Sequence, residues 1–282
     1  MKKIKICSLV LSSCLILGVL AGCGKTDETG AESENVSETS VLETESADET
    51  VAESAAETVA ETEELEETKI SIPADAEFIE FDADAQVYAN NFLSTFAEQH
   101  LGSFENMRIT QEQLFDFVHI YLKINDNDSI SYETVGEITY ETFTFGTTQD
   151  VIDTYFGISL SPNSYNIQPT PPEVYGDEPV TGPYVMNKKL MYPAADGESY
   201  NTLAIVDSGY IDIDGRLVLL FTVYEIDLDT YWAIDMDAVR AYRNLTPDEA
   251  RSDATLNKVA AGYAVVNVTP SGEYYLFSYT TY

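Results

Sequence analysis

The stretch that decides the fold is YIDIDGRLVLLFTVYEI, residues 210–226. Its second part, Leu217–Ile226, is rich in β-branched and aromatic residues, and its first seven residues are apolar on both alternating faces except for Thr222. Strands that are buried on both faces have this pattern, so we expect a central strand. Asp214-Gly215 is a hairpin signal, and it joins this strand to one predicted over Tyr210–Ile213. The stretch therefore predicts the middle of an antiparallel sheet.

The rest of the chain after residue 70 predicts helices first and strands later. Apolar residues recur at helical spacing in a first helix, at Ala85, Tyr88, Ala89, Phe92, Leu93, Phe96 and Ala97. The same stripe marks a second helix at Leu114, Phe117, Val118, Tyr121 and Leu122. A short third helix is predicted from Thr148 to a stop at Gly157. Further strands are expected over Ser131–Val135, Ile138–Phe145, Thr202–Val206, Tyr263–Val268 and Tyr274–Tyr282.

The ends of these helices carry capping signals. Asp82 or Asp84 can cap the first helix, and Gly102 can end it. Thr110 and Gln113 have the spacing of a capping box at the second. Thr246-Pro247-Asp248-Glu249 indicates another helix start between the two hairpins. The order predicts an α+β domain, with N-terminal helices packed on one face of a C-terminal antiparallel sheet.

The first 22 residues have the pattern of an export signal. Lys2, Lys3 and Lys5 precede an apolar stretch of sixteen residues, Ile6–Ala21, which is shorter than the about 20 residues of a membrane span. Leu20-Ala21-Gly22-Cys23 resembles the lipobox of bacterial lipoproteins. The resemblance implies a diacylglyceryl group on Cys23 and cleavage before it, which would hold the chain on the outer face of the cell membrane by two acyl chains. The alternative is a leader that is retained as an N-terminal anchor.

Residues 23–69 are predicted to form a lipidated cysteine followed by a disordered acidic stalk. From Gly24 to Lys69 there are sixteen acids, two lysines and no aromatic residue. Such a segment cannot bury enough apolar surface to offset its chain entropy. The alternative is a transient helix over Ala47–Thr68, which would still act as a spacer. The domain organisation is therefore predicted as 1–22 signal peptide, 23–69 linker and 70–282 a single globular α+β domain.

Composition restricts the function of that domain. All 19 Tyr, 12 Phe and the one Trp follow the linker, and the net charge of the chain is −35. This charge makes nucleic acid a poor partner. The three cysteines, Cys7, Cys14 and Cys23, all lie in or at the leader, so the body has no disulfide and no cysteine nucleophile.

The body also resembles a group of uncharacterised surface lipoproteins of Gram-positive anaerobes. The residues that carry this resemblance are Asn90-Asn91-Phe92-Leu93-Ser94-Thr95-Phe96 and Tyr155-Phe156-Gly157. The resemblance implies a surface location and no particular activity.

No nucleophile signature, zinc motif or phosphate-binding glycine loop is present in the sequence. His100 is interpreted as a cation at a helix end, and His119 as a partly buried filler beside an apolar stripe. No cofactor is therefore expected. Calcium is the one metal considered, because Asp212, Asp214, Asp227 and Asp229 lie in acidic loops and extracellular modules can bind calcium weakly. The alternative is ordinary turn chemistry, because Asn, Asp and Gly favour turns.

Tyrosines suggest a binding surface. Ser159–Pro183 holds six prolines, and a loop of this length is often functional. Its Tyr165 and Tyr175, together with Tyr231 and Trp232, are the candidate ligand contacts, because exposed aromatic rings suit glycans and proteins. The alternative is that such tyrosines belong to the core.

The sequence thus predicts a lipid-anchored, non-enzymatic surface module that binds a protein or a glycan. One alternative is a wall-acting hydrolase that uses two carboxylates. Another is the solute-binding lipoprotein of a transporter, although the alternating strand–helix units of that class are missing.

Overall fold

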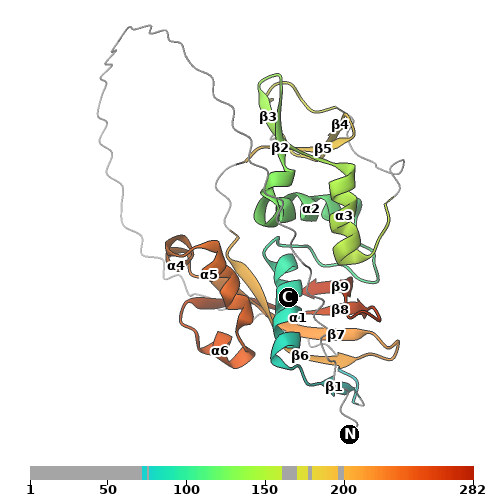
Figure 1. The fold of residues 1–282 in the computed structure, drawn as a ribbon, viewed down its shortest axis with the longest axis vertical. Coiled ribbons are helices and arrows are strands. Elements are labelled where there is room, and N and C mark those ends of the chain that lie inside the picture. The colour runs from blue at the N-terminus through green and yellow to red at the C-terminus, as the bar shows by residue number, and fades with distance from the viewer. Residues whose placement is uncertain (1–71, 75, 161–169, 177–179, 196–199) are drawn as a thin grey trace, which may run out of the picture. The chain divides into compact units, whose positions relative to one another are not determined.

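The computed structural model describes residues 72–74, 76–160, 170–176, 180–195 and 200–282 (Figure 1). All of them belong to one compact unit of the chain. The predicted signal peptide, Cys23 and the acidic linker lie outside the described residues, as does part of the proline-rich stretch.

A five-stranded antiparallel sheet is built around the stretch 210–226. Its order is β1-β6-β7-β8-β9, so β7 is central, as the two apolar faces of Leu217–Ile226 predict. The strands are β1 (Glu77–Ile79), β6 (Thr202–Ile211), β7 (Leu217–Ile226), β8 (Leu256–Val268) and β9 (Tyr274–Thr281). β6 is one strand where the sequence predicted two, because the polar residues after Val206 form a bulge before Ser208 rather than a turn.

Three longer helices lie on one side of this sheet, and they are α1 (Ala83–Ala97), α2 (Gln111–Asn125) and α3 (Phe145–Phe156). There α1 packs on β6, α3 packs on β9, and α2 packs against α3. Asp82, one of the two predicted candidates, caps α1, which ends at Ala97 and not at the predicted Gly102. The capping box of Thr110 and Gln113 opens α2, as predicted. α3 ends at Gly157 in the left-handed conformation with φ 61°. Their apolar stripes form the main core with Ala204, Val206 and the inner faces of β7, β8 and β9.

The other face of the sheet is covered as well, which the sequence did not predict. The connection between β7 and β8 holds α4 (Leu228–Ala233), α5 (Met236–Ala241), the 3₁₀ helix η2 (Tyr242–Asn244) and α6 (Pro247–Ser252). These pack on Leu203 and Ile205, which alternate along β6 with Ala204 and Val206 of the main core. Helices on both faces explain why most residues of the central strand are apolar on either face.

A second antiparallel sheet has the order β2-β3-β5-β4. Its strands are β2 (Ser131–Val135), β3 (Ile138–Thr144), β4 (Tyr184–Met186) and β5 (Lys189–Pro193), and the short η1 (Asn127–Ser129) precedes it. Phe143 and Leu190 point into the main core, whereas Ile138 and Tyr140 belong to a small separate core. The α+β class is confirmed, with two sheets in place of the expected one.

Candidate ligand-binding pocket

Two neighbouring rows of polar residues run along α1, because residues four apart in a helix lie on one face. The first row is Asn90 and Ser94, both fully buried against β6. Asn90 Nδ2 donates to the carbonyl oxygens of Arg243 (2.9 Å) and Leu245 (3.0 Å), and its Oδ1 accepts from Val206 N–H (2.8 Å). Ser94 Oγ exchanges hydrogen bonds with both backbone groups of Ala204. This row fixes α1 on the sheet.

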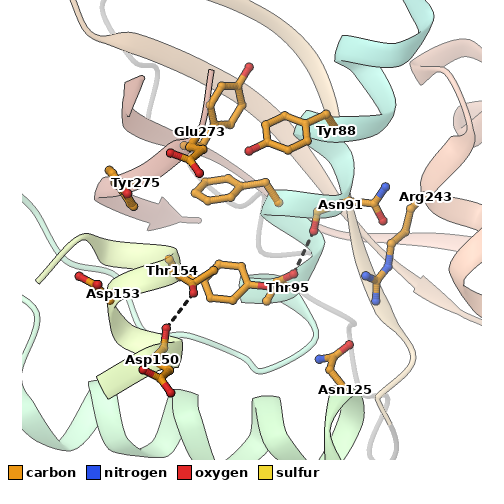
Figure 2. A pocket seen from close by; sticks show the side chains of 13 residues that line it. Tyr88, Asn91, Thr95, Asn125, Asp150, Asp153, Thr154, Arg243, Glu273 and Tyr275 are labelled. Atoms are coloured by element: carbon orange, nitrogen blue, oxygen red, sulfur yellow. Dashed lines mark hydrogen bonds between the residues drawn. The ribbon is translucent and has the colours of Figure 1, made fainter. Parts of the chain in front are cut away.

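The second row, Asn91 and Thr95, makes no such bond to the sheet. Asn91 Nδ2 donates to the Val87 carbonyl (2.8 Å) and Thr95 Oγ1 to the Asn91 carbonyl (3.0 Å), so both bonds stay within α1. Asn91 Oδ1 has no hydrogen-bond partner among the described residues. The row faces a pocket of about 730 Å³ (Figure 2).

The pocket is enclosed by five elements. α1 supplies Tyr88, Asn91, Phe92 and Thr95, α2 supplies Asn125, α3 supplies Asp150, Asp153, Thr154 and Tyr155, η2 supplies Arg243, and residues at the start of β9 supply Glu273, Tyr274 and Tyr275. Asn125 and Thr154 repeat the behaviour of Asn91, because each donates to the carbonyl four residues earlier in its own helix. Asn125 also contacts the Glu98 carboxylate, so the polar side chains of the pocket that only their own helices hold are those of Asn91 and Thr154.

Aromatic rings form the wall between α1 and β9. The ring of Tyr274 contacts those of Tyr88 (centroids 4.8 Å apart) and Phe92 (5.5 Å) edge to face, and Phe92 stacks on Tyr155 (6.3 Å). Burial raises the pKa of Tyr274 to about 12 and raises that of Tyr155 further. Their phenol groups are therefore neutral at physiological pH and can donate hydrogen bonds.

Gly157 positions the remaining ring of the wall. A Cβ at this residue would lie 3.1 Å from Cγ of Tyr275, and its φ of 61° is one that side chains with a Cβ rarely adopt. The Tyr155-Phe156-Gly157 stretch thus contributes both a pocket ring and the space that Tyr275 occupies.

Three carboxylates lie at the rim. Asp150, Asp153 and Glu273 are exposed, and none of them forms an ion pair with a basic group of the described residues. Figure 2 shows them on the side of α3 and β9, opposite Asn91, Thr95 and Arg243. The rim therefore carries negative charge that the protein itself does not compensate.

The basic residue in the lining, Arg243, is already paired. Its guanidinium binds Glu98, and both side chains are buried. Burial raises the pKa of Glu98, while the Arg243 charge and the Asn125 side chain lower it in part. Glu98 Oε1 is buried without a hydrogen-bond partner, so this carboxylate is only half satisfied by the described residues.

The candidate contacts predicted from sequence lie elsewhere. Tyr165 is outside the described residues. Tyr175 is 65% exposed and Trp232 is 67% exposed, but neither lines the pocket. Tyr231 is buried in the core under α4, where its hydroxyl accepts from Tyr200 N–H (3.4 Å), so its ring offers no contact area. The rings of Tyr231 and Trp232 lie edge to face, with their centroids 5.1 Å apart.

Three of the four aspartates considered for calcium use their side chains in local structure. Asp212 Oδ1 accepts from the N–H groups of Asp214 and Arg216 in the hairpin loop, and Asp214 pairs with Arg216. Asp227 caps α4 by accepting from the N–H of Asp229. In the part of the chain that the structure describes, no group of three or more His, Cys, Asp or Glu side chains could hold a metal ion.

Of the two histidines, His119 is partly buried as predicted but has a polar partner that the sequence did not indicate. It stacks on Tyr192 (4.0 Å), and its Nε2 lies 2.6 Å from Glu141 Oε2. His100 lies just beyond the end of α1 with φ 50°.

The pocket itself was missed, although its signal is present in the sequence. Asn90-Asn91 and Ser94-Thr95 double each polar position of a buried helix at a spacing of four. The first residue of each pair is enough to bond α1 to the sheet. The second residue therefore indicates that a further polar surface lies beside the helix. Which elements face that surface depends on the tertiary arrangement of α3, β9 and η2, which local patterns do not contain.

Comparisons with protein-family models, with curated proteins and with solved structures gave no match to this chain. Among the residues that the structure describes, no helix is both long and apolar enough to cross a membrane.

Proposed function

We propose that this chain is a lipid-anchored surface protein whose body binds a glycan in the pocket between α1, α3 and β9. The observation that carries the proposal is the pairing of aromatic rings with polar side chains whose hydrogen bonds remain within their own helices. Ligand sites are typically aromatic clefts of several hundred Å³ with a few placed polar groups.

The chemistry of the lining fits a sugar. A sugar ring has an apolar C–H face and a rim of hydroxyl groups. The rings of Tyr88 and Tyr275 can pack against the C–H face. The amide of Asn91 can donate to and accept from the hydroxyl groups, and the carboxylates can accept from them. A flat protein partner needs an extended surface, whereas this site is concave.

The anchor is supported by the lipobox at Leu20–Cys23 and by the acidic linker that follows it. The anchor would hold the body outside the cell, where wall and surface glycans are abundant. We expect Cys23→Ala to abolish lipid labelling and to release the protein from the membrane fraction.

Calorimetric titration of the full chain in mild detergent with wall-glycan fragments tests the pocket. Tyr88→Ala should weaken binding about tenfold, because a lost aromatic contact costs about 1–1.5 kcal/mol. Tyr132→Ala is the matched control, because Tyr132 is also exposed but lies on β2 outside the pocket. Equal loss in both variants would refute the site.

The same samples test the hydrolase alternative. The protein is incubated with the fragments for a long time, and any cleavage products are then separated. Cleavage that is lost in both Asp150→Asn and Asp153→Asn would replace the binding function by an enzymatic one.

A further inference from the structure

The charge of the pocket restricts what its ligand can be. Asp150, Asp153 and Glu273 bring three carboxylates to one cavity, and the only bonds to their oxygens in the described residues come from the hydroxyl groups of Ser271 and Thr269 to Glu273. Like charges that share a site oppose one another. A ligand with a positive group relieves this repulsion, and an anionic ligand adds to it.

Arg243 does not offset the rim. Its guanidinium is bound to Glu98, and the two buried charges form a neutral pair. The lining therefore retains a net negative charge after its internal pair is counted.

A buried carboxylate behind the lining bears on the same charge balance. Glu98 is 1% exposed and lies against Arg243 and Asn125, two lining side chains. Its Oε1 has no donor among the described residues. Glu98 is not itself a lining residue, and because its carboxylate already binds Arg243, no basic side chain of the described lining remains for the carboxylates of the rim.

The aromatic wall also suits a ligand with a positive group. The faces of tyrosine and phenylalanine rings attract cations by their quadrupole. Tyr88 and Tyr275 lie beside Glu273 in the lining (Figure 2), so one positive group can contact ring and carboxylate together.

We propose that the glycan bound here carries a protonated amino group on the sugar ring, recognised by Asp150, Asp153 and Glu273 beside the tyrosine rings. The inference rests on the proposed glycan-binding function. It adds the substrate class: amino sugars whose nitrogen is free rather than acetylated.

The test compares two tetrasaccharides that differ only at nitrogen, the tetramer of glucosamine and that of N-acetylglucosamine. Each is titrated into the full chain in detergent at pH 6 and low salt. We expect the glucosamine tetramer to bind about tenfold more tightly, because its ammonium groups can each pair with an exposed carboxylate. The difference should shrink in 0.3 M salt, where exposed charges are screened.

A charge-matched pair of variants assigns the effect. The triple variant Asp150→Asn, Asp153→Asn, Glu273→Gln should bind both tetramers equally. The control Glu112→Gln, Asp229→Asn, Asp237→Asn removes the same charge from exposed residues outside the pocket, and should keep the preference. Thermal melting without ligand checks that both variants fold.

The outcomes separate the two proposals. Equal or tighter binding of the acetylated tetramer to the unmodified protein would overturn the amino-sugar inference and leave glycan binding in place. Unchanged preference in the pocket variant would overturn it as well. Binding of neither tetramer, or equal binding of tetralysine, would refute the glycan function itself.

Discussion

The two polar rows of α1 differ in what holds them. Asn90 and Ser94 bond to the backbone of β6 and of the segment around η2, so they are structural. Asn91 and Thr95, one position further along, make no bond to the sheet. Each side chain donates within α1, and Thr95 also contacts Tyr155 in the lining of the pocket that this row faces. The comparison teaches that polar side chains on one helix can either fix the helix on the sheet or line a pocket. Their hydrogen-bond partners, and not their residue types, distinguish the two roles.

Arg243 bonds to the first row and lines the pocket that the second row faces, and it gives the largest expected effect. Its carbonyl accepts from Asn90 and its side chain pairs with Glu98. Arg243→Met leaves a buried carboxylate unpaired, which should lower the free energy of unfolding by about 3–5 kcal/mol at pH 7.5. Arg240→Met, at an exposed residue of α5, should change it by less than about 0.5 kcal/mol.

The loss in free energy of unfolding caused by Arg243→Met should also depend on pH. The pKa of Glu98 is raised in the folded state, so the folded protein binds this proton more tightly than the unfolded chain. Stability therefore falls as pH rises through the folded pKa, and it recovers as pH is lowered. Denaturant unfolding should show that the difference in free energy of unfolding between the variant and the unmodified protein shrinks from pH 8 to pH 5. A constant gap would contradict the assignment of the buried charge to Glu98.

Asn90→Ala breaks the structural row. It leaves the Val206 N–H and two carbonyl groups without their partner, which should cost about 2–4 kcal/mol. For a body of this size the melting temperature should fall by roughly 4–16 °C. Asn91→Ala at the next position is the matched control, and it should cost less than about 0.5 kcal/mol. Equal losses would remove the distinction between the rows.

Gly157→Ala tests how the pocket wall is positioned. The added Cβ meets the ring of Tyr275 in a left-handed conformation, so we expect a loss of about 1–2 kcal/mol and weaker ligand binding. Gly215→Ala separates the two causes, because Gly215 also has positive φ but nothing lies within 4 Å of its added Cβ. Calorimetry should show weaker binding only in Gly157→Ala.

Tyr274→Phe gives the smallest effect, visible only at high pH. The pKa of Tyr274 is raised from 10.0 to about 12, so above pH 10 the unfolded chain loses this proton first and stability falls as pH rises. The variant lacks this titrating group. Between pH 8 and pH 11, its free energy of unfolding should therefore fall by about 1.4 kcal/mol less than that of the unmodified protein. Parallel stability curves for the two proteins would contradict a buried phenol at this position.

Local patterns predicted the parts of the fold that depend on neighbours in sequence. Asp82, the capping box at Thr110 and Gln113, and Gly157 define helix ends through short-range bonds, and all three were predicted correctly. β2 and β7 also match their predicted ranges. α4 and α5 were missed because six residues are too few for a helical period to stand out, and their capping aspartates resembled metal-binding loops.

The site was harder to predict because it is a property of packing. Exposed Trp232 and buried Tyr231 are adjacent in sequence, and composition alone does not tell them apart. The pocket residues come from α1, α2, α3, η2 and β9, and only the fold brings these elements together. The doubled polar positions of α1 were the one local sign of the pocket.

The most direct test of the two-row account is thermal melting of Asn91→Ala with and without the glucosamine tetramer. The account predicts that the variant melts within about 2 °C of the unmodified protein without ligand. It also predicts that the variant loses most of the ligand-induced rise, which for the unmodified protein corresponds to about 2.7 kcal/mol at a hundredfold excess over the Kd. A variant that melts as low as Asn90→Ala, or that keeps the full rise, would contradict it.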